Sequence, residues 1–217
     1  MELQCIPLKF LFETNCYLLQ TETGYILIDT GIKNRRKQLE AAITEAGCKP
    51  GDLKLIIITH GHIDHVGNAA YLRDKYEAKI AMHQGDVNMV TGAGMFADAP
   101  KSPMIKLVGA VMNITGLGDF ETFTPDIYLT DNQSLKEYGL DATVIHNPGH
   151  SEGSISIYTA ELDLFCGDLF NNDKKPVKAT LVQNAEKLDA SVEKIKGLEV
   201  LTVYPGHGKP FPIHQID

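Results

Sequence analysis

Residues 59–67 of the chain read THGHIDHVG and place three histidines and one aspartate within six residues. They follow the run LKLIII at 53–58, which is apolar on both faces, as in a central strand covered by a layer on each side. A packed core disfavours four titratable groups at a strand end, because each needs a hydrogen-bond partner when buried and repels its neighbours when charged. A bound cation removes both problems, so the segment predicts a metal site. Its candidate ligands are His60, His62, Asp64 and His65.

Three later segments also carry histidine or aspartate beside glycine, each directly after a predicted strand. They supply His150 in NPGH, Asp168 in CGD and His207 in PGH. Glycine lets the backbone approach a site closely and turn sharply. Each segment alone is equally well explained as a turn or a surface histidine, but together with 59–67 they predict one site assembled from distant parts of the chain. Imidazole and carboxylate ligands suit zinc, iron or manganese.

Composition indicates a globular chain and excludes several classes of function. The 217 residues are 43% hydrophobic and 22% charged, and no apolar run is long enough to cross a bilayer. A chain of this length fits one domain, so we expect residues 1–217 to form a single unit. The formal net charge of -8 offers no general attraction for phosphates and disfavours nucleic acid as a partner. The N-terminus lacks a basic start before an uninterrupted apolar stretch, which predicts a cytoplasmic protein without a membrane partner.

The periodicity of apolar residues predicts short strands interleaved with helices. The expected elements are a hairpin strand at 14–20, a strand at 25–29, a helix at 33–46, a strand at 53–59, a helix at about 64–76, strands at 79–83, 127–131, 134–138, 140–146, 154–160 and 162–168, a helix at 184–196, and a last strand and loop at 199–208. The front half repeats strand, helix and strand, which is typical of an α/β layered fold.

Residues 91–124 interrupt this pattern. The segment has a glycine-rich start, prolines at Pro100 and Pro103, and the apolar stretch IKLVGAVMNI. We expect an inserted cap or lid here, and the alternative is a surface helix that completes the core, because length alone does not separate the two.

Taken in order, the His-x-His-x-Asp-His cluster, a later His, a later Asp and a final His resemble the signature of the metallo-β-lactamase fold superfamily. The match extends from about Asn15 to His207. The resemblance implies an α/β protein built as a four-layer αββα sandwich, with the inserted helical or loop segment at 91–124 and two divalent metals at the edge between two β-sheets. It also implies that Asp168 bridges the two metals. The resemblance assigns His60, His62 and His150 to one metal and Asp64, His65 and His207 to the other.

Two such cations, expected to be zinc with iron or manganese as alternatives, would yield a metal-bridging hydroxide at neutral pH and polarise a substrate oxygen. Asp64 would ligate one metal and orient the hydroxide or pass its proton to the leaving group. Asp29 resembles a position whose carboxylate holds a ligating imidazole through its other nitrogen, and a turn-capping role is the alternative. His146 is either a supporting residue or a strand-end residue, whereas His83 and His214 are expected to be non-ligands.

The segments THGHIDHVG, PGHSEGS, GDLF and PGHG are most similar to the glyoxalase II-like branch, which hydrolyses thioesters. We therefore predict a metal-dependent hydrolase that cleaves a thioester or ester of a small molecule. A lactonase would use the same site, and an iron-dependent persulfide dioxygenase would share the fold with one redox-active metal. Asp168 stands where some β-lactamases place cysteine, which disfavours antibiotic hydrolysis. A nuclease would want a basic groove, which the charge does not supply.

Substrate specificity is expected to come from 91–124 and from loops near 32–36 and 171–178. Glyoxalase II continues with a helical region that holds glutathione, whereas this sequence runs for only ten residues beyond His207, so strong glutathione specificity is not expected. Lysines in the last loop would bind an acidic substrate tail or form a solvated run. These lysines are Lys174, Lys175 and Lys178.

Overall fold

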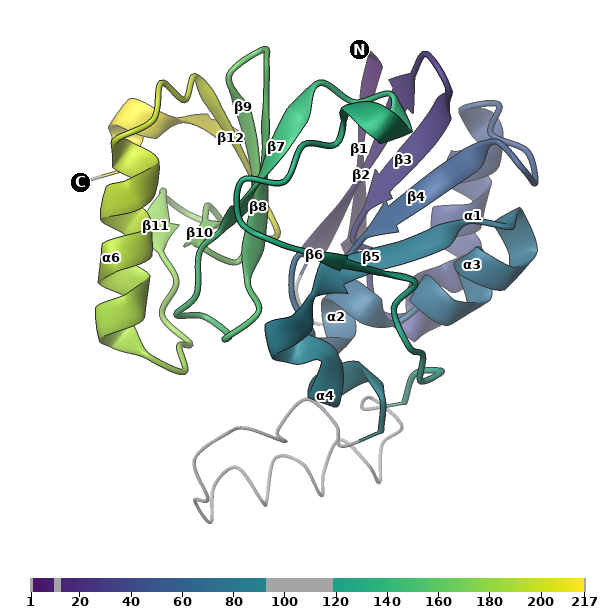
Figure 1. Cartoon of the computed structure of the whole chain (residues 1–217), viewed down its shortest axis with the longest axis horizontal. Coiled ribbons are helices and arrows are strands. Elements are labelled where there is room, and N and C mark those ends of the chain that lie inside the picture. Colours follow the sequence, from purple (N-terminus) through teal and green to yellow (C-terminus); the bar gives the residue numbers. More distant parts are fainter. Residues whose placement is uncertain (1, 10–12, 93–118, 217) are drawn as a thin grey trace.

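Two β-sheets stand face to face in the middle of the molecule, and helices cover the outer face of each (Figure 1). The computed structural model describes residues 2–9, 13–92 and 119–216. Apolar side chains form three buried clusters, one between the sheets and one under the helices on either side. The chain therefore has the four-layer αββα arrangement that its sequence predicts.

The first sheet has six strands. In spatial order they are β1 (Glu2–Lys9), β2 (Glu13–Thr21), β3 (Gly24–Ile28), β4 (Leu53–Ile57), β5 (Lys79–His83) and β6 (Ile127–Leu129). The pairs β1–β2 and β2–β3 are antiparallel, and β3 to β6 run parallel. Because parallel strands end at the same edge of a sheet, the residues that follow β3, β4 and β5 lie close together.

The second sheet has five strands. In spatial order they are β13 (Phe211–Pro212), β12 (Thr202–Pro205), β9 (Asp163–Gly167), β8 (Ile155–Thr159) and β7 (Ala142–His146). The strands β9 and β12 are parallel neighbours, so the residues that follow them meet at one edge. After β9, the chain forms a two-stranded ribbon of β10 (Phe170–Asn171) and β11 (Val177–Lys178).

Helices and 3₁₀ turns, the latter marked η, complete the described part of the chain. They are η1 (Lys33–Arg35), α1 (Arg36–Glu45), α2 (Ile63–Val66), α3 (Ala69–Tyr76), η2 (Gln84–Asp86), α4 (Val87–Val90), η3 (Lys136–Tyr138), α6 (Ala185–Lys196) and η4 (Ile213–Gln215). The Asn184 side chain caps α6 by accepting the Lys187 N–H at 3.0 Å. Of the helices placed in these ranges, none is long and apolar enough to span a bilayer.

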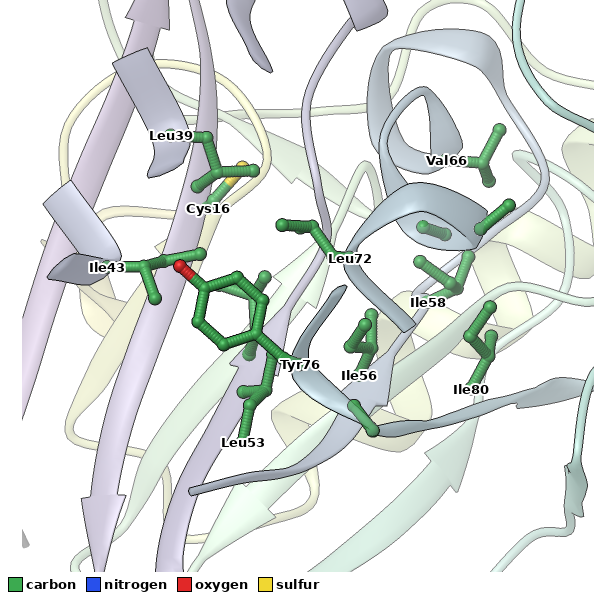
Figure 2. Close-up of a cluster of buried hydrophobic side chains, with 14 of the residues drawn as sticks. Cys16, Leu39, Ile43, Leu53, Ile56, Ile58, Val66, Leu72, Tyr76 and Ile80 are labelled. Carbon is green, nitrogen blue, oxygen red and sulfur yellow. The ribbon is translucent and has the colours of Figure 1, made fainter. Parts of the chain in front are cut away.

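The central strand β4 carries apolar side chains on both faces, as the run LKLIII predicts. Ile56 and the following Ile58 join Leu72 of α3 in a buried cluster beneath α1 and α3 (Figure 2). Leu55 and Ile57 point the other way, into the cluster between the two sheets. Burying one such side chain contributes about 1.5–3 kcal/mol, so this strand anchors the loop that follows it.

The single helix predicted at about 64–76 is wrong, because the chain forms α2 and α3 with a break at Gly67 and Asn68. A Cβ on Gly67 would lie 2.6 Å from the Gly31 carbonyl oxygen, so the loop after β3 packs directly on the break. The Asn68 side chain donates to the Thr30 carbonyl at 2.7 Å. Tertiary contacts with this loop therefore end the first helix.

The strand predicted at 134–138 is also wrong. The turn η3 occupies most of this segment, and Gly139 ends it with a φ of 80°. Leu135 is the one fully buried side chain of the five residues, so the segment has no apolar face to lay on a sheet.

The cap or lid predicted at 91–124 falls mostly on 93–118, which lie outside the described residues. At its described end, Lys33 Nζ lies 2.9 Å from Asp119 Oδ2, and Arg36 Nη2 lies 2.6 Å from Glu121 Oε2. Two cations of the 32–36 loop are thus paired with carboxylates at the described end of 91–124.

Candidate metal centre

The seven predicted ligands come together at the edge where both sheets end. The loop after β4 together with α2 carries four of them, and the loops after β7, β9 and β12 each carry one. They are His60, His62, Asp64, His65, His150, Asp168 and His207. Hydrogen bonds join the segments that carry them, since the Gly206 N–H donates to the Gly167 carbonyl at 2.7 Å and the Ile155 N–H donates to the Thr59 carbonyl at 2.9 Å. The distant segments are therefore fixed around one point.

Three imidazole nitrogens form the first group. His60 Nε2 lies 3.1 Å from His62 Nδ1 and 3.1 Å from His150 Nε2, and His62 Nδ1 lies 2.9 Å from His150 Nε2. A tetrahedral zinc site with bonds of 2.0–2.1 Å separates its ligand atoms by about 3.3 Å. The three nitrogens thus stand close to the separation that a shared cation requires.

A second group pairs imidazole with carboxylate. Asp64 Oδ2 lies 3.3 Å from His207 Nε2 and 3.5 Å from His65 Nε2. Asp168 lies between the two groups, because its Oδ2 is 3.5 Å from His150 Nε2 and 3.3 Å from His207 Nε2. Its other oxygen, Oδ1, is 3.4 Å from His65 Nε2. Asp168 therefore lies within 3.5 Å of ligand atoms of both groups.

The polar atoms of this site fit a metal better than they fit one another. His65 Nε2 and Asp168 Oδ1 are buried, and the described residues give neither a hydrogen-bond partner. A buried polar atom without a partner costs about 1–3 kcal/mol, and a cation at this point would remove the cost for both. Among the described residues, three sets of side chains are close enough to hold an ion. These sets are His60 with His62 and His150, His60 with His65 and Asp168, and Asp64 with His65 and His207.

The ring nitrogens that face away from the centre are held by hydrogen bonds. His65 Nδ1 lies 2.8 Å from Asp29 Oδ2, and the Thr59 hydroxyl donates to the same oxygen at 2.7 Å. Since a carboxylate only accepts, it fixes His65 Nδ1 as the protonated nitrogen and turns Nε2 toward the centre. His150 Nδ1 donates to the Leu181 carbonyl at 2.6 Å, and His207 Nδ1 donates to the Glu13 carbonyl at 2.7 Å.

Asp29 therefore holds the imidazole of the candidate ligand His65, which is the position that the resemblance implies for it. It also occupies the turn after β3 in the left-handed conformation, with a φ of 58°, which aspartate tolerates better than most residues. The structure therefore shows both features that the sequence leaves open for Asp29, the hydrogen bond to an imidazole and the place in a turn.

Two glycines allow the loops to close around the centre. A Cβ on Gly206 would lie 2.3 Å from Asp168 Oδ1 and 2.8 Å from His65 Cε1. Gly167 has a φ of 50°, and a Cβ there would lie 2.6 Å from Thr59 Oγ1. Any side chain at either position would push the ligand-bearing loops apart.

Burial and neighbouring charge divide the histidines into two kinds. Burial, reinforced by the neighbouring His150, lowers the pKa of His62 to about 3, and burial with the neighbouring imidazoles holds the pKa of His60 well below its usual range. Burial also opposes the charge of His207, but Asp168 and Asp64 outweigh it and raise the pKa of His207 to about 10. The pKa of His65 is raised in the same way, because three carboxylates outweigh its burial. In metal-free protein near neutral pH, His60 and His62 are therefore neutral, whereas His65 and His207 carry protons.

Metal uptake should consequently release protons from one group and not from the other. We expect metal-stripped protein, titrated with Zn²⁺ at pH 7.5 in weak buffer, to take up one equivalent with little proton release and another with release of up to about two protons from His65 and His207. The apparent affinity of the proton-releasing equivalent should rise with pH toward the pKa of His207, about 10. A pH indicator reports the release. The variant His207→Gln should lower the number of protons released. Uptake of both metal equivalents without proton release would contradict the assignment of protonated side chains to His65 and His207.

His83, His146 and His214 belong to none of these sets, and the non-ligand role expected for His83 and His214 stays a prediction. The His83 and His146 rings stack on each other with centroids 3.9 Å apart, and His146 Nε2 donates to the Glu152 carbonyl at 2.9 Å. His146 is thus a strand-end residue that joins the two sheets. Lys178 forms an ion pair with Asp189, whereas Lys174 and Lys175 are exposed.

Two residues that sequence reasoning missed contact the ligand loops. The buried Thr14 hydroxyl donates to Asp64 Oδ2 at 3.2 Å. The carboxylate of Asp86, which is fully buried, accepts hydrogen bonds from the loops that carry His62 and His150. Neither residue lies in a motif, and only the three-dimensional contacts identify them.

An αββα sandwich with histidines and aspartates where its two sheets end defines a class of metal-binding proteins. The chain belongs to the metallo-beta-lactamase superfamily, whose family model matches residues 10–207. The family and the fold predicted from the sequence are thereby confirmed.

Individual proteins of known sequence or structure resemble this chain over most of its length. The chain is 27% identical to a beta-lactamase-like protein 2 homolog from Caenorhabditis elegans over 90% of its own length, and it spans 56% of that protein. It is 28% identical to the hydroxyacylglutathione hydrolase GloC of Haemophilus influenzae, over 78% of this chain and 72% of that protein. Among solved structures, TTHA1623 in a di-iron-bound form superposes with a TM-score of 0.74 at 26% identity, over 96% of this chain and 95% of that chain.

Proposed function

We propose that this protein is a hydrolase that holds two divalent metal ions, with zinc expected first, and cleaves a thioester or ester of a small molecule. The observation that carries the proposal is the convergence of seven side chains into two neighbouring ligand sets, with Asp168 between them. One metal would be held by His60, His62 and His150, and the other by Asp64, His65 and His207. Bound there, the metals would supply an acidified water and polarise the carbonyl oxygen of the substrate.

Asp64 has the position and charge to orient the attacking water. Burial alone would raise its pKa, but the charges of His65 and His207 hold it well below the usual range. The carboxylate is therefore ionised at neutral pH, and Thr14 fixes one of its oxygens. An ionised carboxylate accepts hydrogen bonds and does not donate them, so Asp64 would hold the water as an acceptor.

The same feature favours thioesters over oxygen esters. A thiol has a pKa of about 8.5, so the thiolate is a good enough leaving group to depart without a proton donor, whereas an alcohol, with a pKa close to that of water at about 16, needs a proton. A site whose carboxylates stay ionised is better suited to the first kind of leaving group. The relationship to the hydroxyacylglutathione hydrolase GloC supports the same substrate class.

A substrate panel run on protein with measured metal content tests the proposal. We expect thioesters to be hydrolysed fastest, oxygen esters and lactones more slowly, and phosphodiesters and β-lactams at background. Close to two metals per chain should accompany full activity. Preference for a lactone would redirect the proposal to a lactonase that uses the same residues.

The iron-dependent persulfide dioxygenase requires a separate arm of this experiment. The di-iron-bound form of TTHA1623 keeps iron open as the metal, but a dioxygenase of this kind uses one iron, whereas two ligand sets stand side by side here. Oxygen uptake with a persulfide substrate, in the absence of thioester hydrolysis, would overturn the proposed function.

A further inference from the structure

Asp86 lies outside the seven candidate ligands and is fully buried at the end of η2, just after β5. A buried carboxylate needs strong hydrogen-bond partners, because desolvation of an ionised group is costly. The partners of Asp86 come from two loops that are far apart in the sequence.

Three donors surround this carboxylate. The Gly61 N–H donates to Oδ2 at 2.8 Å, and the Ser151 hydroxyl donates to the same oxygen at 2.6 Å. The Gly153 N–H donates to Oδ1 at 2.7 Å. Gly61 stands between the histidines of the loop after β4, and Ser151 directly follows the histidine of the loop after β7. One side chain therefore joins the loops that carry all three imidazoles of the first group.

The packing around Asp86 leaves these loops little freedom. A Cβ on Gly153 would lie 2.5 Å from the Asp86 backbone nitrogen, and a Cβ on Gly61 would lie 3.1 Å from Asp86 Cβ. Gly85 is similarly close, because a Cβ there would lie 2.8 Å from the Gly153 nitrogen. The backbone segments are thus in direct contact, and the carboxylate fixes their relative position.

The first group depends on that position more than the second. Its three nitrogens come from two loops that end different sheets, and they lie 2.9–3.1 Å apart. Because metal ligands must be held close to their productive geometry, a displacement of one loop relative to the other would weaken metal binding by this group. The group with Asp64, by contrast, takes His65 from the same loop and His207 from the loop after β12, which Asp86 does not contact in any hydrogen bond of the described residues.

We propose that Asp86 is a positioning residue that sets the metal affinity of the three-histidine group by locking the loop of His60 and His62 to the loop of His150. The inference rests on the proposed function for its use in hydrolysis, but it concerns metal binding and is tested by metal binding. Removing a partner that orients metal ligands typically lowers metal affinity by about 10–100-fold.

The variant Asp86→Asn tests this. Asparagine keeps the shape of the side chain but replaces one accepting oxygen with a donating NH₂. Because the three groups around residue 86 donate their hydrogen bonds, at least one of these bonds is lost. We titrate metal-stripped protein with Zn²⁺ against a chromophoric chelator, and with Co²⁺, whose absorption bands distinguish the two sites. The equivalent bound by the three-histidine group should weaken about 10–100-fold, while the equivalent bound by Asp64, His65 and His207 is unchanged. Co²⁺ absorption spectra should lose the bands of the three-histidine site alone.

Two further variants keep the outcome interpretable. Ser151→Ala removes one of the three hydrogen bonds and should weaken the same equivalent by about fivefold, the effect of one ordinary bond. The control Asp126→Asn alters a carboxylate that accepts the Ile80 N–H at 2.8 Å beside the other end of β5, and it should leave both metal equivalents unchanged. If Asp86→Asn misfolds, Ser151→Ala decides the question.

Equal weakening of both equivalents in Asp86→Asn, or no weakening in either Asp86→Asn or Ser151→Ala, would overturn the inference. Failure of the proposed function looks different, because wild-type protein would then bind two metals and still hydrolyse no thioester or ester.

Discussion

The variant Asp168→Ala should lose nearly all hydrolytic activity together with its full metal content. Asp168 lies between the two groups, with Oδ2 3.5 Å from His150 Nε2 and Oδ1 3.4 Å from His65 Nε2. Its pKa lies well below the usual range, because the charges of His65 and His207 outweigh the effect of burial, so it contributes a full negative charge. On the proposed function, removing it would leave two cations without a shared anion. Losing several kcal/mol of transition-state stabilisation corresponds to a rate about a thousandfold lower.

Size and charge are separated by a second variant. Asp168→Asn keeps the side-chain volume beside Gly206 but loses the charge and one acceptor. Its hydrolytic activity and metal content should fall nearly as far as those of Asp168→Ala. The control Asp141→Ala removes a carboxylate that is 61% exposed and lies 3.2 Å from Lys136 Nζ at the surface, and it should behave as wild type. Metal content by elemental analysis and the thioester rate are measured on the same samples. Two metals per chain with an unchanged rate in Asp168→Ala would refute the bridging role.

The candidate ligands could be found from the sequence because their signal is local. THGHIDH follows a run of apolar residues that can only be a buried strand, and four titratable groups have no other use at its end. The later ligands carried weaker signals, a single histidine or aspartate beside glycine, but the sandwich places every one of them at the same edge. The glycines proved informative for a physical reason, since a side chain at Gly206 would collide with Asp168.

The features that sequence reasoning missed depend on contacts between distant segments. The break between α2 and α3 comes from the loop after β3, which packs on Gly67 and hydrogen-bonds Asn68. Asp86 accepts hydrogen bonds from Gly61 and Gly153, which lie 25 and 67 residues away in the sequence. Strand β1 was not expected either, although it pairs with β2 along its whole length. Periodicity within a window of ten to twenty residues contains none of these contacts.

Removal of the metals should also lower the thermal stability by a large amount. The site gathers buried groups that have no adequate partners without a cation, among them His65 Nε2 and Asp168 Oδ1. A ligand present at 100 times its Kd stabilises the native state by about 2.7 kcal/mol, so two independent metals contribute about 5 kcal/mol. For a domain of this size 1 kcal/mol corresponds to about 2–4 °C, and chelator-treated protein should therefore melt about 10–20 °C below the metal-loaded form. Calorimetry before treatment, after treatment and after Zn²⁺ is restored gives the comparison, with Asp168→Ala expected to show a smaller difference and Asp141→Ala the full one. If stripped and loaded wild-type protein melted within about 2 °C of each other, the buried site would not be built around metal.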